Sequence, residues 1–329
     1  MKYLVMFPAG ASEMVVSVLR ASFGPVLECD DSAAIFSTKK PFQADAFPFA
    51  KNAFLILAET ARGSIDNVTK QLSARVAGTR VSTGRLPFRV MFHVDGGLVP
   101  VRPQARKQLE EALAKSTGGT VSSRGDCQEY WVVGRRGWNQ MYLASRLPKA
   151  KADRLPKGAL SDELASLLVH ASSPRPSDVF LDPFGGSGSI VAARAGFPAK
   201  RVIYNDLRPS DFAISRLKRL RTVSRVEFAN WNAEYPPEAL AGAVNCIVTD
   251  PPWGEFDESI ADFRGWLLKT MSGLTKALSP GGGRLVMLVN RRNAEEASHV
   301  FSTLGMQGSQ PLEILVNGHP ATVLRVHWQ

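Results

Sequence analysis

The sequence feature that most constrains the fold is a short apolar segment, Val179 to Asp182, that runs into a glycine-rich stretch from Gly185 to Gly188. This pattern predicts a buried strand, a tight turn and then a helix that begins at Ser189. Because glycine has no Cβ atom, its backbone amides can come close to a nucleotide-like ligand at the carboxyl edge of a parallel sheet. The segment therefore predicts a ligand-binding turn within an α/β domain.

The rest of the C-terminal half alternates strands and helices, as a doubly wound sheet does. Strands are predicted at 179–182, 201–205, 226–230, 245–250, 284–290, 312–316 and 321–327. Helices are predicted at 161–168, 189–195, 211–221, 259–277 and 294–304. The last two strands are close in sequence, which predicts a terminal hairpin and one antiparallel edge strand on an otherwise parallel sheet. The expected fold is a Rossmann-like, seven-stranded α/β domain.

The N-terminal half shows a different, α+β pattern. Strands are predicted at 3–7, 33–37, 88–94, 129–133 and 140–147, and helices at 12–21 and 102–116. The basic, proline-bounded stretch 147–157 is typical of a linker. We therefore expect an α+β region over 1–80, a second α+β unit over 81–147, a linker over 148–160 and the α/β domain over 161–329.

The charge of the chain is unevenly distributed. The net charge is +10, and residues 1–150 hold 20 Lys and Arg against 12 Asp and Glu, while residues 151–329 hold 20 against 18. A polyanionic substrate contacted by the N-terminal half explains this surplus, and an ordinary solvated basic surface explains it equally well. The three cysteines are widely spaced and form no Cys-x-x-Cys pair, so neither a disulfide framework nor a zinc site is expected.

No part of the sequence approaches the roughly 18 to 20 uninterrupted apolar residues that a membrane span needs. Together with the cysteine pattern, this favours a cytoplasmic protein with no membrane partner and no metal. The sequence leaves the oligomeric state open.

A second motif follows the apolar strand that ends at Asp250, namely Pro251, Pro252, Trp253 and Gly254. Two prolines cannot continue strand pairing and force an extended backbone without N–H donors. A planar amino group on a base ring is a poor nucleophile until acceptors hold its N–H groups. Asp250 and the proline carbonyls can supply these acceptors while Trp253 stacks on the ring. The alternatives are a loop that merely stops a strand and a tryptophan of the core.

Taken together, the two motifs predict methyl transfer from S-adenosylmethionine to an amine. Asp206 follows the glycine turn by about 20 residues, where an acidic side chain can bind ribose hydroxyls, although it can equally cap a helix. Asn232 and Ala233 lie where an adenine edge is expected. The turn has neither a Gly-Lys-Ser/Thr element nor a Gly-x-Gly-x-x-Gly pattern, which disfavours a nucleoside triphosphatase and NAD. The predicted cofactor residues are Asp182, Pro183, Phe184, Gly185, Gly186, Ser187, Gly188, Asp206, Asn232 and Ala233.

At these motifs the sequence resembles the THUMP-domain RNA methyltransferases, which modify the exocyclic amine of guanosine, especially in tRNA. Asp182 to Gly188 matches their Asp-Pro-Phe-x-Gly-Ser-Gly turn, and Asp250 to Gly254 matches their Asp/Asn-Pro-Pro-Tyr-Gly motif. The resemblance is strong from about Leu155 to Trp253. This sequence departs from the family where Gly185 replaces cysteine, Ser189 replaces threonine and Trp253 replaces tyrosine.

The resemblance implies an N-terminal ferredoxin-like region followed by a THUMP-like domain that grips RNA, with Gly125 to Val133 as its matching segment. It implies formation of N2-methylguanosine in tRNA, on a base flipped into the site, with Asp250, Pro251, Pro252 and Trp253 as the catalytic residues. Because a tryptophan like Trp253 also occurs in adenine N6-methyltransferases, an N6-adenine or other amino-methyltransferase is the alternative. The candidate RNA contacts are Arg89, Arg102, Arg106, Lys107, Arg135 and Arg136.

Overall fold

The computed structural model describes residues 1–79, 85–125, 127–150, 153–253, 262–316 and 318–328. Internal contacts divide the chain into two compact units. The first consists of Met1–Phe7 and Ser12–Lys151, and the second of Pro8–Ala11 and Ala152–Gln329. The expected boundary between regions 1–80 and 81–147 stays a prediction, and both regions contribute strands to one sheet.

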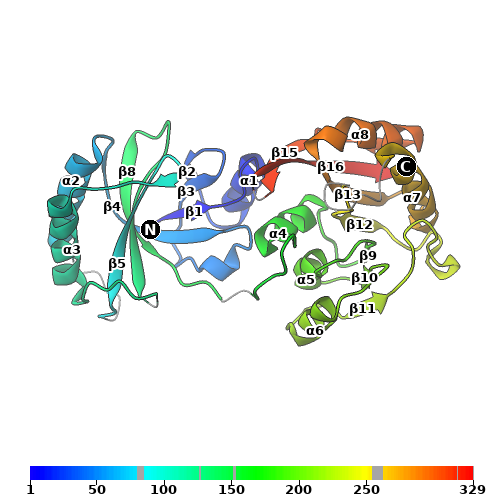
Figure 1. Cartoon of the computed structure of the whole chain (residues 1–329), viewed down its shortest axis with the longest axis horizontal. Coiled ribbons are helices and arrows are strands. Elements are labelled where there is room, and N and C mark those ends of the chain that lie inside the picture. The colour runs from blue at the N-terminus through cyan, green and yellow to red at the C-terminus, as the bar shows by residue number, and fades with distance from the viewer. Residues whose placement is uncertain (80–84, 126, 151–152, 254–261, 317, 329) are drawn as a thin grey trace. The chain divides into compact units, whose positions relative to one another are not determined.

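The first unit is built on an eight-stranded sheet with the order β2-β3-β1-β4-β8-β7-β5-β6 (Figure 1). Only β5 and β7 run parallel, and the other neighbouring strands are antiparallel. Its elements are β1 (Lys2–Met6), α1 (Ser12–Ser22), β2 (Val26–Cys29), β3 (Ala33–Ser37), β4 (Asn52–Ala61), α2 (Ile65–Ala77), β5 (Phe88–Val94), β6 (Gly97–Leu98), α3 (Pro103–Thr117), β7 (Gln128–Gly134) and β8 (Gln140–Arg146).

Helices α2 and α3 lie side by side against one part of this sheet (Figure 1). Val68, Leu72 and Val76 of α2 recur at helical spacing and are buried with Leu109 and Leu113 of α3. Burial of such a stripe stabilises each helix by about 1.5–3 kcal/mol per large apolar side chain. This value is an upper bound, because the unfolded chain already buries part of its apolar surface. None of the described helices is long and apolar enough to cross a membrane.

The second unit is a doubly wound α/β domain. Its sheet has the order β11-β10-β9-β12-β13-β16-β14, and β15 also pairs with β16. The five strands β9 to β13 are parallel, and β16 is antiparallel to β13, β14 and β15. The elements are α4 (Asp162–Ala171), β9 (Val179–Asp182), α5 (Ser189–Ala195), β10 (Arg201–Asn205), α6 (Asp211–Arg219), β11 (Val226–Ala229), β12 (Cys246–Thr249), α7 (Phe263–Ala277), β13 (Gly283–Asn290), α8 (Ala294–Thr303), β14 (Met306–Gly308), β15 (Leu312–Val316) and β16 (His319–Trp328).

The expected Rossmann-like fold is confirmed, with one strand more than the seven predicted. The additional strand, β14, pairs with Val326 to Trp328 of β16, while β15 pairs with His319 to Val323 of the same strand. Two short strands therefore share one edge of a long one. The sequence prediction missed β14 because three residues, only one of them buried, carry no clear alternation.

Helices cover both faces of this sheet, with α4, α5 and α6 on one side and α7 and α8 on the other (Figure 1). Strand β13 is buried at every position, as expected for a strand covered on both faces. Leu267, Met271 and Leu274 of α7 enter the core on their side. This packing fixes the carboxyl ends of β9, β10 and β12 in a rigid frame.

Candidate active site

The strand order places the ligand crevice beside β9. From β9 the chain proceeds outward to β10 and β11, and then crosses to β12 on the other side of β9. In open α/β sheets, ligands bind at the carboxyl ends of the strands, at the point where the winding direction reverses. Asp182 and Thr249 are the last residues of β9 and β12, and both motifs predicted from the sequence therefore meet at this reversal point.

Asp182 is buried, with 1% of its surface exposed. Its Oδ1 accepts hydrogen bonds from the Thr249 hydroxyl at 3.0 Å and from the Phe184 N–H at 3.2 Å. Its Oδ2 has no hydrogen-bond partner in the part of the chain that the structure describes. Burial raises the pKa of this carboxyl to about 8, and the neighbouring carboxylates Asp250 and Asp206 contribute to the rise. The site thus contains a buried acid with one oxygen left for a ligand.

The glycines of the turn are required by close packing. A Cβ atom at Gly185 would lie 2.3 Å from Cε2 of Tyr204, so the Tyr204 ring excludes any side chain there. The Tyr204 hydroxyl donates to the carbonyl of Gly186 at 3.0 Å and holds the turn. Gly188 caps α5 with a positive φ of 77°, and a Cβ there would lie 3.0 Å from Leu217. The glycines therefore let the turn pack directly against Tyr204 and Leu217.

Asp206 connects the end of β10 to the turn. Its carboxylate accepts from the N–H groups of Gly186 and Arg208, each at 2.8 Å. A carboxylate that already accepts two backbone N–H groups keeps lone pairs free for two ribose hydroxyls. Asp206 therefore fixes the turn, and its expected contact with ribose hydroxyls stays a prediction.

Asn205 is a site residue that the sequence prediction did not single out. It is fully buried, and its Nδ2 donates to the carbonyls of Pro183 at 3.1 Å and Trp231 at 3.0 Å. Its Oδ1 accepts from the Trp231 N–H at 2.9 Å. One amide side chain therefore ties together the loops that follow β9, β10 and β11. The only sequence signal was its position at a strand end, next to Asp206.

The residues predicted at the adenine edge lie in the loop after β11. Asn232 is exposed, and its Oδ1 accepts from the Glu234 N–H at 3.0 Å, whereas Ala233 is buried. Helix α7 packs tightly on this loop, because a Cβ at Gly273 would lie 2.2 Å from the Glu234 carbonyl. Asn232 therefore shapes a turn, and its expected contact with adenine stays a prediction.

The Asp-Pro-Pro-Trp element begins directly after β12. Asp250 is partly exposed, Pro251 is buried and Pro252 is exposed. Burial of the carboxyl raises the pKa of Asp250 to about 7, and the indole N–H of Trp253 opposes this rise. The Trp253 carbonyl accepts from Asn293 Nδ2 at 3.3 Å. Gly254, the last residue of the motif, lies outside the described residues.

Aromatic side chains gather next to the turn. The Phe184 ring lies 5.7 Å from that of Trp266, which in turn lies 6.0 Å from Phe263. Both Trp266 and Phe263 belong to α7. Ser187, whose Oγ is 3.1 Å from Ser189 Oγ, lies at the start of α5. Phe184 precedes the glycines and Ser187 lies between Gly186 and Gly188, and the expected contacts of both residues with the cofactor stay predictions.

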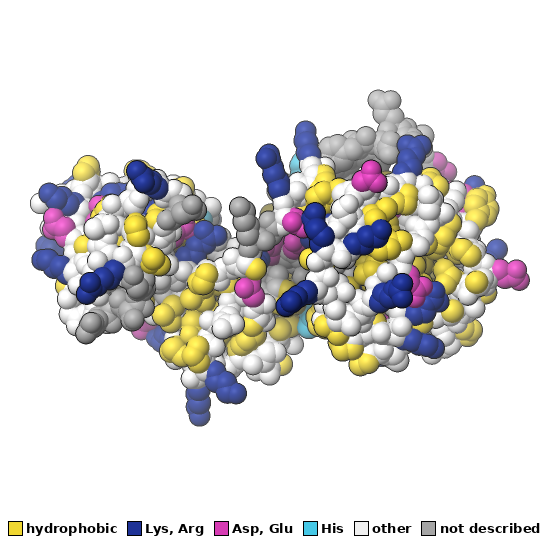
Figure 2. Space-filling model, turned by 90° about the horizontal axis from the view of Figure 1, so that it is seen from below, with side chains coloured by type: hydrophobic (Ala, Val, Ile, Leu, Met, Phe, Trp, Pro, Cys, Tyr) yellow, Lys and Arg dark blue, Asp and Glu magenta, His cyan; other side chains and the backbone are white. Residues whose placement is uncertain are grey.

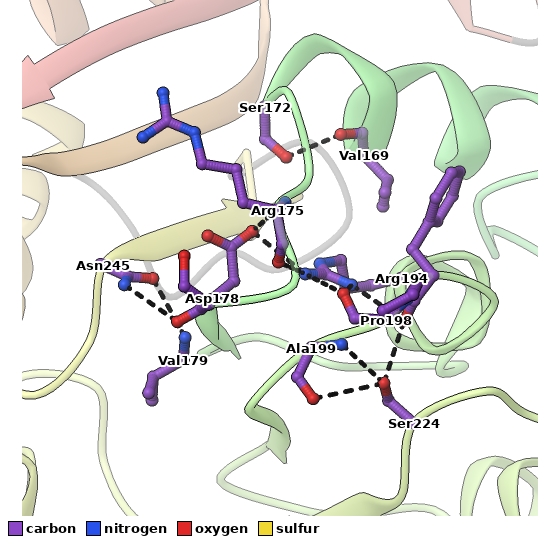
Figure 3. Close-up of polar contacts among 12 residues, drawn as sticks. Val169, Ser172, Arg175, Asp178, Val179, Arg194, Pro198, Ala199, Ser224 and Asn245 are labelled. Atoms are coloured by element: carbon purple, nitrogen blue, oxygen red, sulfur yellow. Dashed lines mark hydrogen bonds and ion pairs between the residues drawn. The ribbon is translucent and has the colours of Figure 1, made fainter.

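The opposite end of β9 is anchored by a buried charged cluster (Figure 3). Asp178 is fully buried, and its carboxylate pairs with Arg194 at 3.0 Å and with Arg284 at 2.6 Å. It also accepts from the Arg175 N–H at 2.8 Å, and Asn245 Oδ1 accepts from the Val179 N–H at 3.0 Å. Removal of one partner from such a buried pair typically costs about 3–5 kcal/mol. The cluster therefore fixes β9 at the edge remote from the crevice.

The candidate RNA contacts in the first unit differ in their surroundings. Arg135 is paired with Asp30 at 2.7 Å and is only 13% exposed. Arg89 pairs with the buried Glu129, and Arg106 donates to the Val90 carbonyl. The exposed candidates are Arg102, Lys107 and Arg136. Within the described ranges no group of three His, Cys, Asp or Glu residues could hold a metal ion.

Comparison with known proteins bears directly on the second unit. Residues 150–303 match the family model UPF0020, described as an RMKL-like methyltransferase domain. The C-terminal half is a methyltransferase domain. The match supports S-adenosylmethionine as the cofactor, which the residues around the glycine turn predicted.

Two relatives share part of this sequence. The chain is 27% identical over 215 residues to the tRNA (guanine(6)-N2)-methyltransferase of Thermus thermophilus, covering 62% of this chain and 62% of that protein. It is 32% identical over 100 residues to the probable tRNA (guanine(10)-N2)-dimethyltransferase of Methanothermococcus thermolithotrophicus, covering 28% of this chain and 60% of that protein. The chain thus spans less than two thirds of the length of either relative.

Solved structures share the fold of the methyltransferase domain and of the first unit. TrmN from Thermus thermophilus has a TM-score of 0.82 at 20% identity and covers 100% of both chains. A possible methylase from Clostridium difficile 630 has a TM-score of 0.75 at 13% identity, covering 98% of this chain and 97% of that one. SMU.472 complexed with SAH has a TM-score of 0.71 at 10% identity, covering 100% of this chain and 98% of that one.

The residues of the methyltransferase domain fit S-adenosylmethionine. A Cβ at Gly186 would meet only the Phe184 carbonyl, at 3.9 Å, Asp206 offers acceptors for hydroxyl groups, and Asp182 Oδ2 is a buried acceptor without a partner among the described residues. These features match a ligand that carries a ribose and a charged amino group. Thr249 and Tyr204, which support Asp182 and the turn, were not identified from the sequence.

Proposed function

We propose that the protein transfers a methyl group from S-adenosylmethionine to the exocyclic N2 of guanosine in tRNA. The partial similarity to two proteins named as tRNA guanine-N2 methyltransferases supports this proposal. The observation that carries it is the placement of Asp250, Pro251 and Trp253 at the carboxyl end of β12, directly beside the cofactor turn on β9. Acceptors for an amino group thus lie next to the methyl donor's binding turn.

The residues of the loop account for the chemistry of an amine. The Asp250 carboxylate and the Pro251 carbonyl accept hydrogen bonds from the two N–H groups of N2 and orient its lone pair. Nitrogen gains positive charge as it attacks, and a carboxylate aimed at that charge stabilises the transition state. The bond from carbon to nitrogen forms as the bond from carbon to sulfur breaks, and S-adenosylhomocysteine leaves.

Asp250 is suited to take the proton that the methylated nitrogen loses. Burial raises its pKa to about 7, close to the pH at which a general base is most effective. The tryptophan of the loop supplies an aromatic face on which a flipped guanine can stack. Stacking of this kind contributes about 1–3 kcal/mol per base, which offsets much of the cost of unstacking the nucleotide.

In this proposal the first unit holds the RNA. It comprises a ferredoxin-like region over residues 1–80 and a THUMP-like domain over 81–147, joined to the catalytic domain by the linker 148–160. The basic surplus of residues 1–150 supports contact with phosphates. On the face shown in Figure 2, Lys and Arg side chains are scattered over both units and are not gathered in one patch. Recognition by shape and by several dispersed phosphates fits such a surface.

The test is incubation of the protein with labelled S-adenosylmethionine and unmodified tRNA, followed by nucleoside digestion and mass spectrometry. The proposal predicts N2-methylguanosine. N6-methyladenosine would instead support the alternative, an adenine N6-methyltransferase. Trp253 favours that alternative, because a tryptophan at this position of the motif also occurs in adenine N6-methyltransferases. Absence of any labelled nucleoside in tRNA would contradict the proposed substrate.

A further inference from the structure

The two halves of the active site are joined by one buried side-chain hydrogen bond. Strands β9 and β12 pair through their backbones only at Phe180 with Cys246 and at Leu181 with Ile247. Strand β12 continues its pairing with β13 as far as Thr249. Past Leu181, the strands are connected instead by the Thr249 hydroxyl, which donates to Asp182 Oδ1 at 3.0 Å. This contact lies at the carboxyl ends of β9 and β12, where the winding direction of the sheet reverses.

Both partners of this hydrogen bond are buried. Thr249 is fully buried and Asp182 is 1% exposed. A buried hydroxyl that donates to a carboxylate favours its charged form, so Thr249 lowers the pKa of Asp182 against the larger, opposite effect of burial. The Thr249 hydroxyl and the Phe184 N–H both donate to Asp182 Oδ1. Asp182 Oδ2 is therefore the carboxylate oxygen without a partner among the described residues.

The cofactor has a group that suits this oxygen. S-adenosylmethionine carries two positive charges, a sulfonium without N–H groups and an ammonium with three N–H donors. A buried carboxylate oxygen is satisfied best by a charged donor. We propose that Thr249 is a positioning residue for the cofactor, which holds Asp182 through Oδ1 so that Oδ2 binds the ammonium group. The same contact fixes the end of β12 from which Asp250 projects.

The test measures the affinity of the Thr249→Val variant for two cofactor analogues by isothermal titration calorimetry, in the absence of RNA. S-adenosylhomocysteine retains the ammonium group, and 5′-methylthioadenosine lacks it. Because a hydrogen bond to a charged group is lost, we expect Thr249→Val to bind S-adenosylhomocysteine about tenfold more weakly. Its affinity for 5′-methylthioadenosine should stay within about twofold of the original protein. Thr249→Ser restores the hydroxyl and should recover the affinity for S-adenosylhomocysteine.

A matched control is Thr322→Val on β16. Thr322 is 1% exposed and its hydroxyl also donates to a carboxylate oxygen, Glu313 Oε1, at 3.0 Å. The two substitutions therefore remove the same kind of bond, but only Thr249 lies at the crevice. We expect Thr322→Val to bind both ligands normally. Asp182→Asn serves as a second variant and should show the same selective loss as Thr249→Val if the latter folds poorly.

Two results would overturn the inference. Equal weakening of both ligands would mean that Thr249 supports the crevice in general, and unchanged binding of S-adenosylhomocysteine would mean that the contact has no role in binding. Neither result bears on the choice of RNA, because no RNA is present. Conversely, a failure to form N2-methylguanosine would leave this inference intact.

Discussion

Asp250 provides the most informative perturbation of the proposed chemistry. Replacement by Asn keeps the size of the side chain and one oxygen acceptor but removes the negative charge and the ability to take a proton. Loss of one electrostatic contact aimed at transition-state charge typically lowers kcat by about 10²–10³. We therefore expect Asp250→Asn to retain cofactor binding and to lose methyl transfer by a factor in this range.

The pH dependence sharpens this prediction. Burial raises the pKa of Asp250 to about 7, so the original protein is about one tenth ionised at pH 6 and about nine tenths at pH 8. Its rate of methyl transfer should rise about tenfold across this range and then level. Asp250→Asn has no group to ionise there, and its residual rate should stay flat.

The assay is single-turnover transfer of labelled methyl groups to tRNA between about pH 5.5 and pH 9. Asp211→Asn is a suitable control, because Asp211 is exposed at the start of α6. It should have the rate and the pH profile of the original protein. A rise in rate with pH that persists in Asp250→Asn would refute the assignment of this ionisation to Asp250.

Three further predictions concern stability and RNA binding. Asp182 has a folded pKa of about 8 against an ordinary value of 3.8, so the folded state retains a proton that the unfolded chain releases, and stability falls as the pH rises through this window. Asp182→Asn should therefore raise Tm at about pH 8.5 and change it little near pH 4, as calorimetry would show. Gly185→Ala places a Cβ 2.3 Å from the Tyr204 ring and should destabilise the protein by about 1–3 kcal/mol in denaturant titration, a prediction that an unchanged midpoint contradicts. Arg136→Ala should weaken tRNA binding and reduce its salt slope by about one, whereas Arg135→Ala should chiefly lower Tm, because it leaves Asp30 without its partner.

The fold of the catalytic half was predictable because its strands are short, apolar and separated by strong helix signals. Strand β10 and helix α5 were predicted with the bounds that the structure shows, and α4 begins after Ser161, whose hydroxyl accepts from the Leu164 N–H at 3.3 Å. In the first unit, α2 was missed although its apolar residues recur at helical spacing. The order of the strands in the first sheet depends on pairings that local sequence does not encode.

The parts of the candidate site that could be predicted are the loops whose backbone conformation requires glycine or proline. The glycines and the Pro-Pro pair stand out because few residues tolerate the conformations that these loops need. Thr249 and Asn205 act through hydrogen bonds to residues 67 and 26 positions away in the chain. Partners so distant are determined only by the three-dimensional fold, so these two residues could not be identified from spacing. The contact of the Tyr204 ring with Gly185 could not be predicted either, because these two residues are also distant in the sequence.

The central claim is that the loop after β12 directs methyl transfer to the N2 amine of a guanine. Inosine is identical to guanosine except that it lacks this amine. The most direct measurement therefore compares methyl transfer to one tRNA with guanosine or inosine at the modified nucleotide. We predict transfer to the guanosine form and none to the inosine form. Methylation of the inosine form at that nucleotide would contradict the account.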